Sequence, residues 1–128
     1  MAEIPRGNRP LSPHLLVYRQ PLTAITSILT RITGQGLMPG LLLIVWWLAA
    51  AATSPAAFAT ADAVLRSWFG ALVLLVALWS LWFHFLAGLR HLWYDSGRGM
   101  EIRQGRILSI AILALSAVLA LVTLVMLA

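Results

Sequence analysis

The chain has 128 residues, of which 61% are hydrophobic and only 10% are charged, and its mean hydropathy is +0.90. A soluble domain of this size is normally about a quarter charged, so the composition excludes an ordinary water-soluble protein and indicates a single membrane domain over residues 1–128. The absence of cysteine excludes disulfides, thiolate metal sites and cysteine nucleophiles, and no basic run interleaved with aromatic residues suggests nucleic-acid binding.

Three long apolar runs carry no charged residue. They cover residues 32–61, 67–89 and 107–128. A helix needs about 20 apolar residues to cross a hydrocarbon core of about 30 Å, and only helices satisfy their own backbone polar groups there without forming a closed barrel. The runs lack the two-residue alternation of barrel strands. The sequence therefore predicts an all-α membrane protein with three transmembrane helices, at about 22–50, 64–94 and 104–127.

Local signals modify the first span and the segment that follows it. Four residues are expected to kink or loosen the first helix: Gly34, Gly36, Pro39 and Gly40. Ser54 and Pro55 are typical of a helix start, with the serine as N-cap and the proline at the first helical position. We interpret the residues after them as a short surface helix that leads into the second span.

The positions of the arginines predict the orientation. All nine basic residues are arginine, and six of them flank the predicted N-terminal side of the first span or follow the second span. These are Arg6, Arg9, Arg19, Arg98, Arg103 and Arg106. The loop between the first two spans has only Arg66 and Asp62. The positive-inside rule then places the N-terminus in the cytoplasm and the C-terminus on the outer side.

The stretch HFLAGLRHLWYD at 84–95 carries titratable residues at helical spacing. His84, Gly88, His91 and Asp95 are 4, 3 and 4 residues apart, which puts them on one helix face. If Asp95 marks the inner boundary, His84 lies about 16 Å inside it, near mid-bilayer, and His91 about 6 Å inside. An imidazole at mid-bilayer suits a metal ligand, as in haem. The alternatives are that His84 hydrogen-bonds a neighbouring helix, that Gly88 serves helix packing, and that Arg90 snorkels to the interface.

A second polar group lies at the start of the first span. Ser27 and Arg31 are at positions i and i+4 of one helix, near the inner interface. A hydroxyl and a guanidinium there can donate to an oxygen-rich group such as a quinone carbonyl or a carboxylate. The alternative is a hydroxyl-rich helix start with a snorkelling arginine, although polar groups inside a membrane are functional candidates by default.

Three stretches in order resemble the cytochrome b membrane-anchor subunit of succinate dehydrogenase, respiratory complex II. They are RPLSPHLLVYR at 9–19, SILTRITG at 27–34 and HFLAGLRHLWYD at 84–95, and the last fits the pattern His-x3-Gly-x-Arg-His-x3-Asp. The resemblance runs from about residue 9 to the end of the chain and includes the spacing of the three spans. Together the motifs are highly specific.

The resemblance implies a subunit of succinate:ubiquinone oxidoreductase that does not catalyse alone. Such a subunit forms a helix bundle with a second small membrane-anchor subunit, and the pair anchors an iron–sulfur subunit and a flavoprotein subunit. Electrons pass from succinate through FAD and the iron–sulfur centres to the quinone. The implied location is the bacterial cell inner membrane, with the C-terminus in the periplasm and lipid around the spans. The remaining alternative is a haem-free membrane scaffold or small transport subunit.

The resemblance also assigns roles to individual residues. His84 is expected to be one axial ligand of a haem b, whose other axial histidine comes from the second anchor subunit. Ser27 and Arg31 are expected to form part of the ubiquinone site, and His91 and Arg31 to face the haem near the inner surface. Many members have histidine just before this arginine, where the present chain has Thr30. Because a hydroxyl cannot carry a proton as imidazolium does, His91 or Arg31 would take over a proton-relay or propionate-pairing role.

Overall fold

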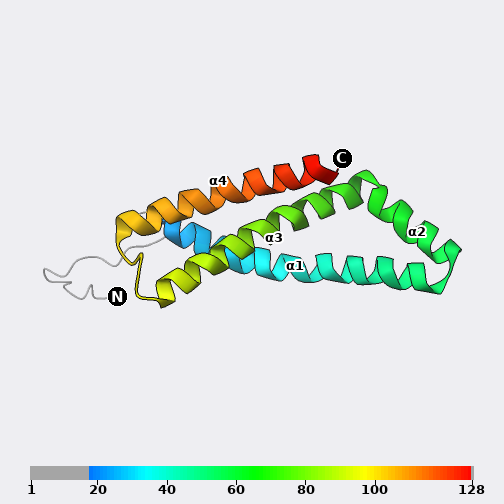
Figure 1. The fold of residues 1–128 in the computed structure, drawn as a ribbon, viewed down its shortest axis with the longest axis horizontal. Coiled ribbons are helices and arrows are strands. Elements are labelled where there is room, and N and C mark those ends of the chain that lie inside the picture. The colour runs from blue at the N-terminus through cyan, green and yellow to red at the C-terminus, as the bar shows by residue number, and fades with distance from the viewer. Residues whose placement is uncertain (1–17, 128) are drawn as a thin grey trace, which may run out of the picture.

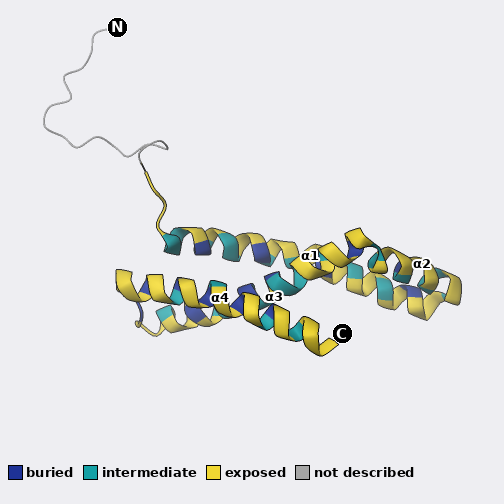
Figure 2. Ribbon diagram, turned by 90° about the horizontal axis from the view of Figure 1, so that it is seen from above, coloured by how far each residue is buried: buried dark blue, intermediate teal, exposed yellow. Residues whose placement is uncertain are grey.

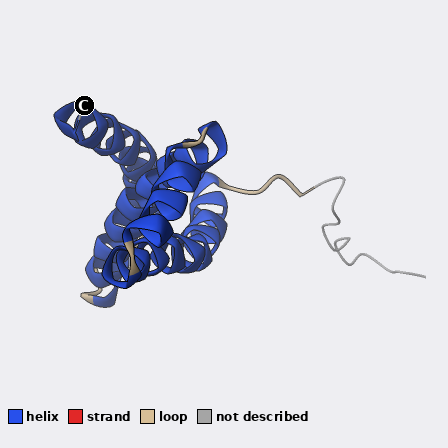
Figure 3. Cartoon of the chain, turned by 90° about the vertical axis from the view of Figure 1, so that its right-hand side faces the viewer, coloured by secondary structure: helices blue, strands red, loops and turns tan. Residues whose placement is uncertain are grey.

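The computed structural model describes residues 18–127, and every regular element in this range is a helix (Figures 1 and 3). The helices are α1 (Leu22–Thr53), α2 (Pro55–Arg66), α3 (Trp68–Asp95) and α4 (Ile102–Leu127). Three of them, α1, α3 and α4, are long and apolar enough to cross a membrane, which confirms the predicted all-α class and its three spans. His14 and most of the first motif, residues 9–17, lie outside the described residues.

The break between α1 and α2 follows the local sequence signals. The Ser54 hydroxyl accepts a hydrogen bond from the backbone N–H of Ala57 at 3.1 Å, and Pro55 occupies the first turn, so the predicted cap is confirmed. In contrast, α1 runs without interruption through Pro39. Gly40 in this stretch packs closely against α3, because a Cβ there would lie 3.3 Å from the Cβ of Ala77.

The second long helix begins at Trp68, a few residues later than the sequence predicted, because a second cap separates α2 from α3. The Ser67 hydroxyl accepts from the backbone N–H of Gly70 at 3.1 Å. Gly70 lies directly against the carbonyls that end α2, and a side chain at this position would collide with them. The turn is therefore tight, and α2 becomes a separate helix rather than the first turns of the span.

Along the bundle, α1 and α4 run in one direction and α3 runs in the opposite direction (Figure 1). The start of α1, the end of α3 and the start of α4 lie at one end of the bundle, whereas α2 lies at the other. Consequently Arg19, just before α1, and the arginine-containing loop at 96–101 lie at the same end, as the predicted topology requires.

The core is small and lies where α1, α3 and α4 approach one another. Phe83, Ala87 and Ile112 form its buried apolar cluster, and Trp79 packs against Phe83 with ring centroids 5.3 Å apart. Many of the large apolar residues are exposed, and exposed positions, in yellow, run along all four helices (Figure 2). In the most apolar stretch of α1, only 11% of the residues are buried by this chain. Lipid or other chains must cover the rest.

Candidate functional site

The imidazole of His84 on α3 is held by the backbone of α1. Its Nδ1 lies 3.0 Å from the carbonyl oxygen of Thr30. Because a carbonyl oxygen only accepts, Nδ1 is the donor in this hydrogen bond and Nε2 carries the lone pair. Histidines that bind metals commonly donate their other ring nitrogen to a carbonyl in this way, which fixes the tautomer and the ring orientation. In this orientation Nε2 of His84 is the ring nitrogen that could bind a metal.

Gly34 provides the space in which the His84 ring lies. A Cβ at this position would stand 2.7 Å from Cε1 of His84 and 3.1 Å from its Nδ1. Any side chain there would push the imidazole away from the Thr30 carbonyl. From the sequence, Gly34 was expected only to weaken α1, so its contact with the histidine was missed. The sequence carries no local signal for a contact between two helices 50 residues apart.

The predicted stripe on α3 lies beside the buried face of the helix rather than on it. The most buried residues in this part of α3 are Ser80, Phe83, Ala87 and Arg90. On the stripe, His84 and Gly88 are half-buried, whereas His91 and Asp95 are exposed. A Cβ on Gly88 would meet no atom within 4 Å. The surface one turn from His84 is thus left open by this chain and can be covered by a bulky group from outside it.

The described part of the chain contains no group of three or more His, Asp or Glu side chains that is placed to hold a metal ion. A site made wholly of protein ligands is therefore not available within residues 18–127. A single oriented imidazole suits a metal that already has most of its ligands, as iron has in a porphyrin ring.

Ser27 and Arg31 lie on α1 close to the residue that holds His84. Ser27 is half-buried and Arg31 is exposed, and neither side chain has a hydrogen-bond partner within residues 18–127. The neighbouring threonines differ, because Thr30 and Thr33 donate to carbonyls of their own helix at 2.8 Å. The hydroxyl-rich start of α1 is thus divided between side chains bonded to the helix itself and a pair that remains available to a ligand.

His91 lies on the exposed side of α3, two turns beyond His84. Its ring makes an edge contact with the ring of Tyr94, with centroids 6.3 Å apart. The carbonyl that binds His84 belongs to Thr30, the residue before Arg31, so the imidazole lies beside the backbone of α1 next to Arg31. The structure shows no such link for His91 among the described residues.

Arg90 does not snorkel to the interface, so that interpretation of the sequence is wrong. The residue is only 5% exposed. Its Nη1 donates to the hydroxyls of Thr26 on α1, at 2.8 Å, and Ser109 on α4, at 3.2 Å, and these two oxygens are 3.1 Å apart. The guanidinium therefore joins all three long helices. Inside the bundle, the hydroxyls of Thr26 and Ser109 accept the hydrogen bonds that a snorkelling arginine would donate to water at the interface.

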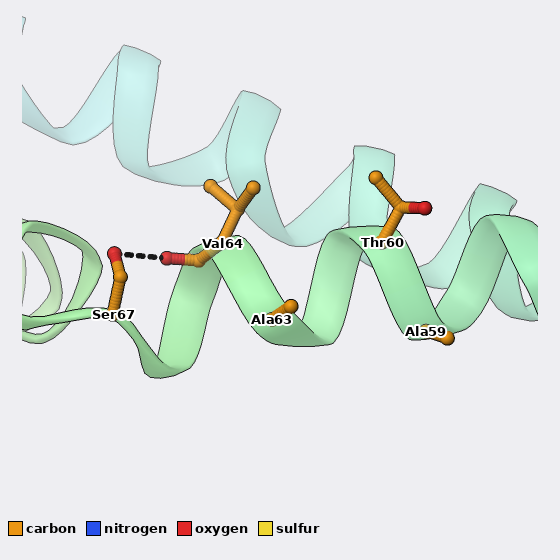
Figure 4. A pocket seen from close by; sticks show the side chains of 5 residues that line it. All are labelled: Ala59, Thr60, Ala63, Val64 and Ser67. Carbon is orange, nitrogen blue, oxygen red and sulfur yellow. Dashed lines mark hydrogen bonds between the residues drawn. The ribbon is translucent and has the colours of Figure 1, made fainter.

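A hollow on α2 is a less suitable site (Figure 4). It is lined by Ala59, Thr60, Ala63, Val64 and Ser67, and the Ser67 hydroxyl donates to the Val64 carbonyl at 2.6 Å. None of these side chains is charged or titratable, so the hollow offers no group that could act as an acid, a base or a charged donor.

Comparisons with known proteins identify a family and several relatives that the chain resembles. A family model described as "Succinate dehydrogenase/Fumarate reductase transmembrane subunit" matches residues 5–123. The chain is 62% identical over 125 residues to the succinate dehydrogenase cytochrome b556 subunit of Paracoccus denitrificans, and the match covers 98% of this chain and 96% of that protein. It is 34% identical over 98 residues to the subunit of the same name from Rickettsia conorii, covering 76% of this chain and 75% of the relative. It is 36% identical over 100 residues to the succinate dehydrogenase cytochrome b560 subunit of Reclinomonas americana, covering 74% and 69%.

Proposed function

The chain belongs to the family of succinate dehydrogenase/fumarate reductase transmembrane subunits, and from this premise we propose that it supplies one axial ligand of a haem b and part of a ubiquinone site. It is a cytochrome b-type membrane subunit of a succinate-oxidising complex that also contains flavoprotein and iron–sulfur subunits. The observation that carries the proposal is the orientation of His84, whose Nδ1 donates to the Thr30 carbonyl so that Nε2 is left to bind iron.

The haem fits the residues present. His84 provides the lone pair, Gly34 allows the ring to lie against α1, and the open surface beside Gly88 leaves room for a flat ligand next to the histidine. When bound, haem b carries single electrons. The chain holds the ligand imidazole in one tautomer and keeps it half-buried among apolar helices.

The second axial histidine comes from another chain, the second small membrane-anchor subunit. His91 is seven residues beyond His84 on the same helix, about 10.5 Å along its axis, so the two imidazoles cannot bind one iron from opposite sides. The many exposed apolar residues on α1, α3 and α4 are consistent with a partner bundle.

Ser27 and Arg31 supply donors to ubiquinone. Both side chains are without partners within the described residues, and they lie one turn apart at the start of α1. A charged donor and a hydroxyl can hydrogen-bond the carbonyl of the quinone ring and stabilise negative charge on its oxygen during reduction. His91 and Arg31 are suited to charged groups of the haem near the same membrane surface.

The visible spectrum of the purified complex tests the proposal as a whole. We expect a b-type haem in the reduced-minus-oxidised spectrum and co-purification of flavoprotein, iron–sulfur and second anchor subunits. A complex that contains this chain, oxidises succinate and has no b-type haem would contradict it and favour a haem-free scaffold.

Topology gives a separate prediction. Reporter fusions at Asn8 and Gly99 are expected to give a cytoplasmic signal and fusions within the 53–63 segment a periplasmic signal, because arginines are concentrated near the start of α1 and the start of α4. The location is then the bacterial inner membrane, with the N-terminus in the cytoplasm and the C-terminus in the periplasm. A periplasmic signal at Gly99 would reverse the orientation.

Replacement of Gly34 by alanine is expected to weaken the haem site. The added Cβ would overlap the His84 ring, so the imidazole must leave the Thr30 carbonyl or α1 must move. Gly36→Ala is the matched control on the same helix, because a Cβ at Gly36 would lie within 4 Å of no other group. We expect Gly34→Ala to broaden or shift the low-spin haem signal in electron paramagnetic resonance and Gly36→Ala to leave it unchanged. Equal spectra would contradict the role assigned to Gly34.

A further inference from the structure

The buried guanidinium of Arg90 is a charge that no carboxylate neutralises within the described part of the chain. Within residues 18–127 its hydrogen-bond partners are the hydroxyls of Thr26 and Ser109, and its Nε has none. The centroid of the neutral Tyr94 ring lies 5.8 Å from its Cζ. The one ion pair formed within residues 18–127 joins Arg66 to Asp62, at the opposite end of the bundle. The hydroxyls offer dipoles to the cation but no opposite charge.

Such an arrangement is unfavourable for stability alone. A cation removed from water loses hydration energy, and in most proteins a buried arginine is compensated by a carboxylate. Hydrogen bonds to two neutral hydroxyls and the contact with the Tyr94 ring offset only part of this loss. Because an arginine side chain remains protonated in proteins, Arg90 cannot escape the penalty by becoming neutral. The positive charge is therefore a permanent feature of the interior where α1, α3 and α4 meet.

Arg90 lies close to His84. The two residues are six positions apart on α3, which corresponds to about 9 Å along the helix. They also contact α1 one turn apart, since Thr26 binds the guanidinium and the Thr30 carbonyl binds the imidazole. The surroundings are helices with apolar side chains, where water does not screen a charge as it does in solution.

We propose that Arg90 raises the reduction potential of the haem held by His84 through the field of its buried charge, without touching the haem. This inference rests on the proposed function of His84. Reduction adds an electron, and a positive charge nearby favours the state with more negative charge. At an effective dielectric constant of about 20, a unit charge about 10 Å from a redox group shifts its reduction equilibrium by roughly ten-fold. For a one-electron couple, a ten-fold shift corresponds to about 59 mV.

The test is an equilibrium redox titration of the haem in the complete complex, expressed with all its subunits. Arg90→Gln removes the charge and keeps a donor for the two hydroxyls, so we expect the reduced-to-oxidised ratio at a fixed potential to fall about ten-fold. Arg90→Lys keeps the charge and is expected to leave the haem potential near that of the unmodified complex. A purely structural role would make the two variants alike.

A second pair of variants keeps Arg90 in place. Ser109→Asp sets a carboxylate beside the guanidinium and is expected to lower the haem potential in the same direction as Arg90→Gln. Ser109→Ala removes the same hydroxyl without adding charge and is the matched control, expected to change the potential little. If the Arg90→Gln complex does not assemble, this pair of variants still shows whether the charge of Arg90 affects the haem potential.

The outcomes separate this inference from the proposed function. If the complex contains no haem b dependent on His84, the proposed function fails. If the haem is present and binds through His84, an unchanged potential in Arg90→Gln or in Ser109→Asp overturns the role of Arg90 alone. Equal shifts in Ser109→Asp and Ser109→Ala would also overturn it, because packing and not charge would then be the cause.

Discussion

Replacement of His84 by leucine is expected to abolish the low-spin haem b spectrum of the co-expressed complex. Leucine has a similar volume but no lone pair, so the iron loses an axial ligand from this chain, and the Thr30 carbonyl loses its donor. The reduced-minus-oxidised optical spectrum and electron paramagnetic resonance measure the change. His91→Leu is the control on the same helix, and we expect a smaller perturbation because His91 is exposed and two turns away.

Expression of the chain without its partner tests whether the haem site is shared between two subunits. The described residues of the chain contain two histidines, which the helix separates by about 10.5 Å along one side. We therefore expect no stable bis-histidine haem in the isolated chain. A low-spin bis-histidine spectrum from the monomer would refute the shared site, and so would an unchanged spectrum in the His84→Leu complex.

Loss of the donors at the start of α1 is expected to impair quinone reduction. Arg31→Ala and Ser27→Ala should each lower succinate-dependent ubiquinone reduction, and the arginine variant should show the larger loss. Removing a hydrogen bond from a charged donor typically costs about 1.5–3 kcal/mol, which corresponds to roughly ten-fold or more in quinone binding. Steady-state assays over a range of quinone concentrations measure the effect.

Two controls make this experiment specific. Succinate oxidation with a soluble dye as acceptor should remain normal in the Ser27 and Arg31 variants, because the dye takes electrons before they reach the membrane site. Arg19→Ala removes an exposed arginine just before α1 and should leave quinone reduction intact. Normal quinone reduction in Arg31→Ala and Ser27→Ala would remove both residues from the quinone site.

The elements that sequence predicted well are those governed by local physics. A run of about 20 apolar residues identifies a span whatever its neighbours are, and the Ser54–Pro55 pair identifies a helix start through a hydrogen bond made within one turn. The predicted start of the second span at about residue 64 was less accurate, because the apolar Val64 and Leu65 belong to α2 and the cap at Ser67 begins α3 only at Trp68.

The features that sequence did not predict depend on contacts between distant segments. The environment of Arg90 was predicted only from its angular position on α3. That position does not reveal that hydroxyls on α1 and α4 accept hydrogen bonds from the guanidinium. Gly34 was likewise assigned a property of its own helix, although its role is to accommodate a ring from α3. Periodicity describes one helix at a time, whereas these residues act at the junction of several.

The hydrogen bond from His84 ends on a backbone oxygen, and this bears on which substitutions position 30 can accept. Every amino acid offers the same carbonyl, so the tautomer of the ligand histidine does not depend on the side chain at that position. The Thr30 hydroxyl instead bonds the carbonyl of Thr26 on its own helix. Position 30 can therefore diverge between histidine and threonine in related chains while the imidazole keeps its orientation.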